Sequence, residues 1–213
     1  MENWYFVLEM IGTAAFAVSG AMRGIEKKMD LFGVMILGMT TAVGGGIIRD
    51  MILGMTPPAA FRDPVYACTA LLISFLIFIP SVREIYARRD FFYEKLLAMM
   101  DSIGLPVFTV VGIETAMSYT AKPNLFLAVF VGVLTGTGGG VLRDLFANIR
   151  PRIFIEDFYA SASLSGALVC VLMWSEFGHL VSAGAGAAVI IILRLFAVRY
   201  HWHLPHADAS EKQ

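Results

Sequence analysis

The sequence predicts an all-α membrane protein of seven transmembrane helices, arranged as an inverted 3+3 repeat plus one extra helix. Three observations predict this fold: an apolar composition, a series of charge-poor stretches of membrane-spanning length, and an internal repeat. Of the 213 residues, 58% are hydrophobic and 15% are charged, against about 25% charged in an ordinary soluble domain. A soluble chain of this length could not bury so much apolar surface, so we expect lipid to solvate much of it.

Seven stretches that carry few or no charges follow one another along the chain. Each is close to the roughly 20 residues that a helix needs to cross the hydrocarbon core of a bilayer. They cover residues 4–22, 31–48, 64–82, 96–118, 124–142, 158–175 and 177–198. We therefore expect a single transmembrane domain over residues 1–213, consisting of repeat one (4–82), repeat two (96–175), helix seven (177–199) and a short cytoplasmic tail (200–213).

The distribution of lysine and arginine between the connections predicts the orientation. Thirteen of these residues lie in the first, third and fifth connections and at the C-terminal end. The other connections hold three, namely Arg49, Arg62 and Lys122. Positive charge accumulates on the cytoplasmic side of membrane proteins. We therefore expect the N-terminus outside and the C-terminus in the cytoplasm, in the inner membrane of a cell.

A repeated string is the strongest local signal. Residues 44–50 read Gly-Gly-Gly-Ile-Ile-Arg-Asp and residues 138–144 read Gly-Gly-Gly-Val-Leu-Arg-Asp, an offset of 94. The same offset pairs Thr41 with Thr135, and an offset of 92 pairs Glu9 with Asp101. Because each unit holds three helices, an odd number, the second copy must enter the membrane from the opposite side.

The triple glycines are the predicted helix breaks and the predicted lining of a pore. Glycine lowers helix propensity by about 1 kcal/mol relative to alanine, and broken helices at matched positions of two repeats indicate a transport site. The alternative is that these small residues only allow close helix packing. The six residues are Gly44, Gly45, Gly46, Gly138, Gly139 and Gly140.

Matched charged and polar residues accompany the glycines. Charge at membrane depth usually faces a polar cavity or a partner, so Arg49, Asp50, Arg143 and Asp144 are candidates for a pore or a gate. Their alternatives are snorkelling to the headgroups or a lock between the repeats.

Glu9 and Asp101 would attract cations at the two vestibules, or they are interfacial acids. Thr41 and Thr135 would line a polar path, or they bond back to their own helix.

Several kinds of chemistry have no signal in the sequence. No phosphate-binding Gly-x-x-x-x-Gly-Lys loop, zinc-type cysteine spacing or nucleophile–base pair occurs. We expect no enzyme, no cofactor and no metal site. A net charge of −1 and the lack of a basic run interleaved with aromatics give no indication of nucleic-acid binding.

On the paired Gly-Gly-Gly-x-x-Arg-Asp strings the chain resembles the prokaryotic TRIC (trimeric intracellular cation) channel family, also catalogued as a bacterial family with a glycine transporter domain. The resemblance covers about residues 4–200. It implies a homotrimer with one pore per subunit, conduction of monovalent cations, chiefly potassium, and bends in helices 2 and 5 at the glycines. Eukaryotic members bind phosphoinositide through a Lys-Glu-Val string that is absent from this sequence.

These observations support three hypotheses. The first is a passive potassium-permeable channel, in which potassium or sodium ions pass between helices 1, 2, 4 and 5, with Arg49 and Arg143 as electrostatic barriers or as partners of the acids. The second is a secondary carrier for a small zwitterion such as glycine, whose carboxylate would bind amides freed by a broken helix. The third is an assembly protein that transports nothing.

Overall fold

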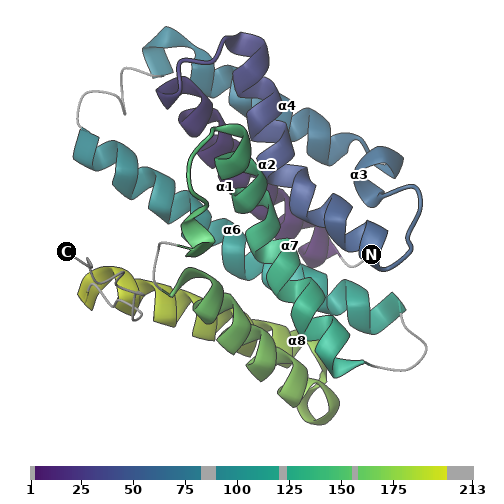
Figure 1. The fold of residues 1–213 in the computed structure, drawn as a ribbon. Coiled ribbons are helices and arrows are strands. Elements are labelled where there is room, and N and C mark those ends of the chain that lie inside the picture. Colours follow the sequence, from purple (N-terminus) through teal and green to yellow (C-terminus); the bar gives the residue numbers. More distant parts are fainter. Residues whose placement is uncertain (1–2, 83–89, 120–123, 155–157, 201–213) are drawn as a thin grey trace, which may run out of the picture.

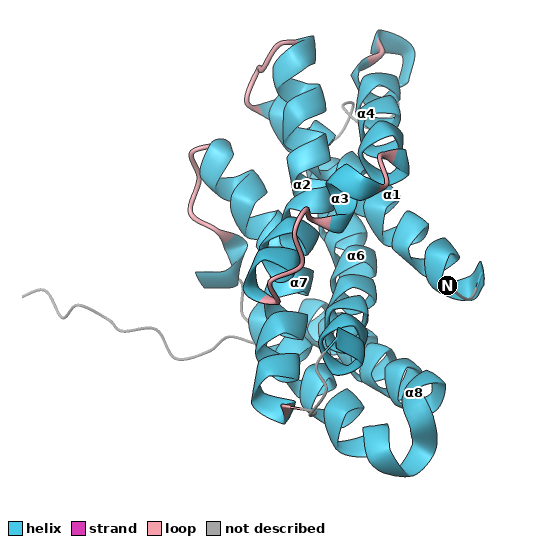
Figure 2. Cartoon of the chain, turned by 90° about the vertical axis from the view of Figure 1, so that its right-hand side faces the viewer, coloured by secondary structure: helices cyan, strands magenta, loops and turns pink. Residues whose placement is uncertain are grey.

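The computed structural model describes residues 3–82, 90–119, 124–154 and 158–200, and the regular structure in these ranges is helical (Figures 1 and 2). The predicted tail lies outside the described residues, apart from Tyr200. The elements are α1 (Asn3–Glu26), α2 (Leu31–Ile52), α3 (Ala59–Arg62), α4 (Val65–Phe78), α6 (Asp90–Tyr119), α7 (Leu125–Phe146), the 3-10 turn η1 (Arg152–Phe154) and α8 (Tyr159–Tyr200).

Within the described residues, five helical segments are long and apolar enough to cross a membrane: Tyr5–Glu26, Leu31–Ile52, Tyr93–Tyr119, Leu125–Phe146 and Tyr159–Ala197. Helix α4 has 14 residues and spans only about 21 Å at 1.5 Å per residue. The third predicted stretch is therefore a shorter helix than expected. Pro80 explains the early end, because the residue before a proline is held in extended conformation and Ile79 has a ψ of 131°.

Helix α8 consists of two arms. Its 42 residues would extend about 63 Å as one straight helix, twice the thickness of a bilayer core. At Gly178 the backbone is not helical (φ 73°, ψ 168°), and the chain folds back on itself (Figures 1 and 2). Gly166 of the first arm packs against Gly186 of the second. The two arms correspond to the sixth and seventh predicted stretches.

Helices α2 and α7 are closely equivalent. Both have 22 residues, and their caps follow the offset of 94. The Asp30 carboxylate accepts a hydrogen bond from the amide of Gly33 (2.7 Å), and the Asn124 side-chain oxygen accepts one from the amide of Leu127 (3.0 Å). The repeated sequence therefore produces repeated helices with the same first turn.

The two units run in opposite directions and meet along two helix pairs. Helix α2 crosses α7 so that Gly45 faces Thr135 and Gly139 faces Thr41.

Helix α1 crosses α6 in the same antiparallel sense, with Gly12 against Phe108 and Gly104 against Phe16. The rings of Phe16 and Phe108 lie 5.2 Å apart at this crossing.

The predicted helix breaks are wrong. Residues 44–46 and 138–140 are helical, and both α2 and α7 run through them without interruption. The physical reason is the close approach of the two helices. A side chain at Gly45 would overlap the carbonyl of Thr135, and one at Gly139 would overlap the carbonyl of Thr41. The glycines therefore serve close packing between the units, which was the alternative interpretation.

Candidate functional site

The two repeated Arg-Asp pairs form the centres of two charged clusters, at the C-terminal ends of α2 and α7. We define the α2 site as Glu9, Arg49, Asp50 and Tyr66, and the α7 site as Ser19, Asp101, Arg143 and Asp144. Because α2 and α7 are antiparallel, the two sites belong to opposite ends of the helix bundle.

Both sites hold their arginine in the same way. The Nε of Arg49 donates to Asp50 Oδ1 at 2.8 Å, and the Nε of Arg143 donates to Asp144 Oδ1 at 2.8 Å. The second oxygen of each aspartate accepts a backbone amide from the segment after the helix, from Ala59 (2.7 Å) and Arg152 (2.9 Å). Each aspartate thus fixes the orientation of the neighbouring guanidinium and closes the following turn.

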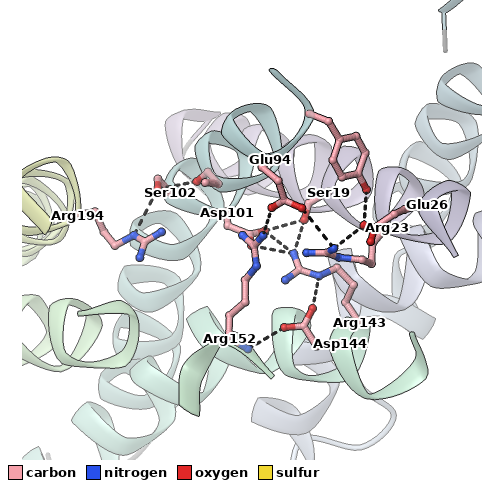
Figure 3. A network of polar contacts seen from close by, with 12 residues as sticks. Ser19, Arg23, Glu26, Glu94, Asp101, Ser102, Arg143, Asp144, Arg152 and Arg194 are labelled. Carbon is pink, nitrogen blue, oxygen red and sulfur yellow. Dashed lines mark hydrogen bonds and ion pairs between the residues drawn. The ribbon is translucent and has the colours of Figure 1, made fainter. Parts of the chain in front are cut away.

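The α7 site is fully paired and buried. The Nη1 of Arg143 donates to both carboxylate oxygens of Asp101, at 2.6 and 2.8 Å, and only 1% of the Arg143 side chain is exposed. Ser19, from α1, accepts from Arg143 and donates to Asp101 at 2.7 Å (Figure 3). Buried charges of this kind persist only where they are compensated, so α1, α6 and α7 are tied together at one point.

A second layer of charge covers the α7 site. Arg152 binds Glu94 at 2.9 Å and approaches Asp101 at 3.6 Å, and Arg23 binds Glu26 at 2.5 Å (Figure 3). Tyr93 donates to Glu26 at 3.0 Å. Neither this layer nor Ser19 was predicted from the sequence. Ser19, Arg23 and Glu26 have no charged counterpart at the offset of 92, and Tyr93 and Glu94 precede the predicted repeat two, which begins at residue 96.

Tyr159 fills the remaining space beside Arg143. A Cβ at Gly140 would lie 3.5 Å from the Tyr159 hydroxyl and 3.9 Å from Arg143 Nη2. The guanidinium of Arg194 lies over the Tyr159 ring, 4.8 Å from its centroid, and the Arg194 Nε is 3.4 Å from the Ser102 hydroxyl. Arg194 is also buried. In the sequence it is only a charge near the end of an apolar stretch, and nothing there indicates its contact with Tyr159.

The α2 site differs in containing a small cavity, although Arg49 and Asp50 are buried there too. Its glutamate, Glu9, accepts a hydrogen bond from Tyr66 at 2.5 Å, whereas its counterpart Asp101 binds arginine. Beside these residues lies a cavity of about 50 Å³, and its lining includes Glu9, Thr13, Gly46, Arg49 and Tyr66. A Cβ at Gly46 would lie 3.9 Å from Arg49 Nη2, with no other neighbour within 4 Å. The structure therefore keeps space here that Tyr159 occupies in the other site.

The two predicted threonines do not face a cavity. Thr41 donates to the carbonyl of Leu37 and Thr135 to that of Val131, both at 2.6 Å, and both are buried at the crossings with α1 and α6. Their prediction as a polar path is wrong, because the hydroxyls bond to their own helices. Among the described residues, no group of three or more His, Cys, Asp or Glu side chains could hold a metal ion.

Comparisons with known proteins agree on one family. A family model described as "Glycine transporter" matches residues 6–81 and 98–175, which are the two repeats. The UPF0126 membrane protein of Deinococcus radiodurans is 40% identical over 93% of this chain and 89% of its own length. The UPF0126 inner membrane protein YadS of Escherichia coli strain K12 is 38% identical over 93% of both chains.

Solved structures give the same result. A structure reported under "Structural basis for conductance through TRIC cation channels" superposes with a TM-score of 0.85, at 36% identity over 96% of this chain and 97% of that one. The TRIC trimeric intracellular cation channel orthologue from Rhodobacter sphaeroides gives a TM-score of 0.83, at 31% identity over 94% and 100%. The chain is thus a membrane protein and belongs to the UPF0126 family, which includes the prokaryotic TRIC channels.

Proposed function

We propose that this protein is a passive channel for monovalent cations, potassium above all, that works as a homotrimer in the inner membrane with one pore in each subunit. The similar structures are named as cation channels, one of them as trimeric. Each subunit crosses the bilayer seven times, as two inverted three-helix units and a seventh helix. The N-terminus lies outside and the C-terminus in the cytoplasm, so the α2 site faces outward and the α7 site inward.

One observation carries this proposal: two repeat-related charged sites lie at opposite ends of a bundle made by α1, α2, α6 and α7. Charge at membrane depth is costly and is retained where ions or water must pass. The path runs from the cavity of the α2 site, past the glycine crossing, to the α7 site. Glu9 favours cations over anions at the outer end, and Asp101 does so at the inner end only when its ion pair with Arg143 opens.

In this proposal the conformation described above is a closed one. The α7 site fills the inner end of the path, because Arg143 and Asp101 bind each other and Ser19. Opening requires α1 and α6 to separate from α7 at this point. Ser19 is the contact from α1, and its loss weakens the closure without leaving a charge unpaired.

Single-channel recording in planar bilayers tests the proposal. Purified wild-type protein in a potassium gradient should give unitary currents that reverse near the potassium equilibrium potential. Ser19→Ala should raise the open probability several-fold, and Ser182→Ala, which removes a hydroxyl bonded only to the Gly178 carbonyl of its own helix at 2.7 Å, should not. Liposomes that pass no potassium under a gradient would contradict channel function.

A secondary carrier for a small zwitterion is the second candidate, and the family model described as "Glycine transporter" favours it. The sequence predicted that backbone amides freed by broken helices would bind the carboxylate of the zwitterion. This does not fit the uninterrupted helices α2 and α7. Recognition would have to come from side chains. Saturable glycine uptake without unitary currents would distinguish a carrier from a channel.

A further inference from the structure

We infer that the cavity of the α2 site binds a small zwitterion of about the size of glycine, with its ammonium group against Glu9 and its carboxylate against Arg49. This inference deepens the second candidate function and rests on the α2 site opening to the outer solution. It does not require transport, because a ligand can bind at the mouth of a channel as well as in a carrier.

The first argument is that groups of opposite charge line one small space. Glu9, Arg49 and Asp50 all line the cavity of about 50 Å³, and Asp50 is already paired with Arg49 at 2.8 Å. A water molecule needs about 10–15 Å³ of such space, so the cavity holds a few waters or a ligand of a few heavy atoms. A zwitterion can contact both Glu9 and Arg49, whereas a bare cation can contact only the carboxylates.

The second argument is the orientation of Arg49. Asp50 takes only the Nε of Arg49, and its other oxygen is committed to the amide of Ala59. Asp50 therefore positions the guanidinium rather than covering its terminal nitrogens. Gly46 keeps open space beside Nη2, where the position of a Cβ is 3.9 Å away. A planar guanidinium held in this way matches a carboxylate ligand.

The third argument is an internal precedent. In the α7 site the equivalent arginine binds a carboxylate, that of Asp101, at 2.6 and 2.8 Å. In the α2 site the counterpart acid, Glu9, is bound by Tyr66 instead. The carboxylate of a ligand can therefore take at Arg49 the place that Asp101 takes at Arg143. Glu9 accepts from Tyr66 through one oxygen, and an ionised carboxylate has about four acceptor sites, so it can also receive an ammonium group.

Isothermal titration calorimetry on the purified full-length protein tests the inference. Glycine should bind saturably to the wild type. Acetate and methylammonium, which each carry one of its charges, should bind at least tenfold more weakly at equal ionic strength. Leucine should also bind more weakly because its side chain exceeds the cavity. Equal binding of glycine and acetate would overturn the inference, and this comparison needs no variant.

Variants sharpen the test. Glu9→Gln and Arg49→Gln should each weaken glycine binding at least tenfold. Arg62→Gln is the matched control, because Arg62 is an exposed arginine on α3 that does not line the cavity. Glycine affinity that is unchanged in both cavity variants would contradict the proposed site.

The outcome is separable from that of the channel proposal. Unitary potassium currents from a protein that does not bind glycine leave the channel intact and overturn the zwitterion site. Glycine binding by a protein that gives no unitary currents supports the zwitterion site and contradicts the channel proposal.

Discussion

The α2 and α7 sites share a motif and differ in how the space around it is used. In both, an aspartate binds the Nε of the preceding arginine at 2.8 Å and ties down the next segment. Around Arg143 that space is filled by Asp101, Ser19 and Tyr159, and around Arg49 it is a cavity. The repeated sequence thus fixes the geometry of the arginine, and residues outside the repeated string decide whether that end of the bundle is sealed.

The largest difference between the two sites should appear in stability. Arg143→Ala leaves Asp101 buried with its main partner removed, which should cost about 3–5 kcal/mol, as for other broken buried ion pairs. Arg49→Ala should cost clearly less, because the cavity lets water reach Asp50. Denaturant unfolding in detergent, followed by circular dichroism, measures both. Equal losses in the two variants would mean that water in the cavity does not compensate the charge left on Asp50.

Thiol labelling compares the space at equivalent glycines. Gly46→Cys places a thiol in the cavity beside Arg49, and Gly140→Cys places one against Tyr159. A water-soluble maleimide should modify the first at least tenfold faster than the second. Cys68 is exposed on α4, so Cys68→Ser is the background for both variants. Equal labelling rates would show that the difference in filling does not persist in the membrane.

The smallest effect should follow loss of the tyrosine that holds Glu9. Tyr66→Phe removes one hydrogen bond to a carboxylate, of 2.5 Å, and should lower stability by about 1.5–3 kcal/mol at most, less where water replaces the hydroxyl. Tyr93→Phe, which removes the bond to Glu26 above the α7 site, is the matched change. A larger loss of stability for Tyr93→Phe than for Arg143→Ala would mean that the second layer of charge contributes more to stability than the α7 site does.

The sequence was informative about helix starts and less so about helix ends. Helix α2 begins at the predicted residue 31, and α7 within one residue of the prediction, because Asp30 and Asn124 cap them. Both helices extend four residues beyond the predicted ends at 48 and 142. The predicted ends lie at the Arg-Asp pairs because charge marks the edge of an apolar stretch. In the structure each arginine binds the neighbouring aspartate, so both residues are buried and the helix continues past them.

The errors concern long-range packing. Nothing in the local sequence shows that Gly45 meets Thr135 or that Gly139 meets Thr41, so three glycines in a row predicted a break. Asp101 and Arg143 were identified through the repeat, but Ser19 was not, because its counterpart at the offset of 92 is Val111. Tyr159 was not identified because its counterpart, Tyr66, lies at an offset of 93, which differs from the two offsets that define the repeat. Repetition identifies what the two halves share, and the difference between them depends on unrepeated residues.

The contact between Phe16 and Phe108 has a consequence for the origin of the fold. These two rings are counterparts at the offset of 92, and so are Gly12 and Gly104. Phe16 packs against Gly104, and Phe108 packs against Gly12. A contact between a residue and its own counterpart across a two-fold axis can form between two identical chains, which one gene encodes. Two separate copies of a single ancestral three-helix chain, inserted in opposite directions, could therefore have formed this contact before any gene fusion joined them.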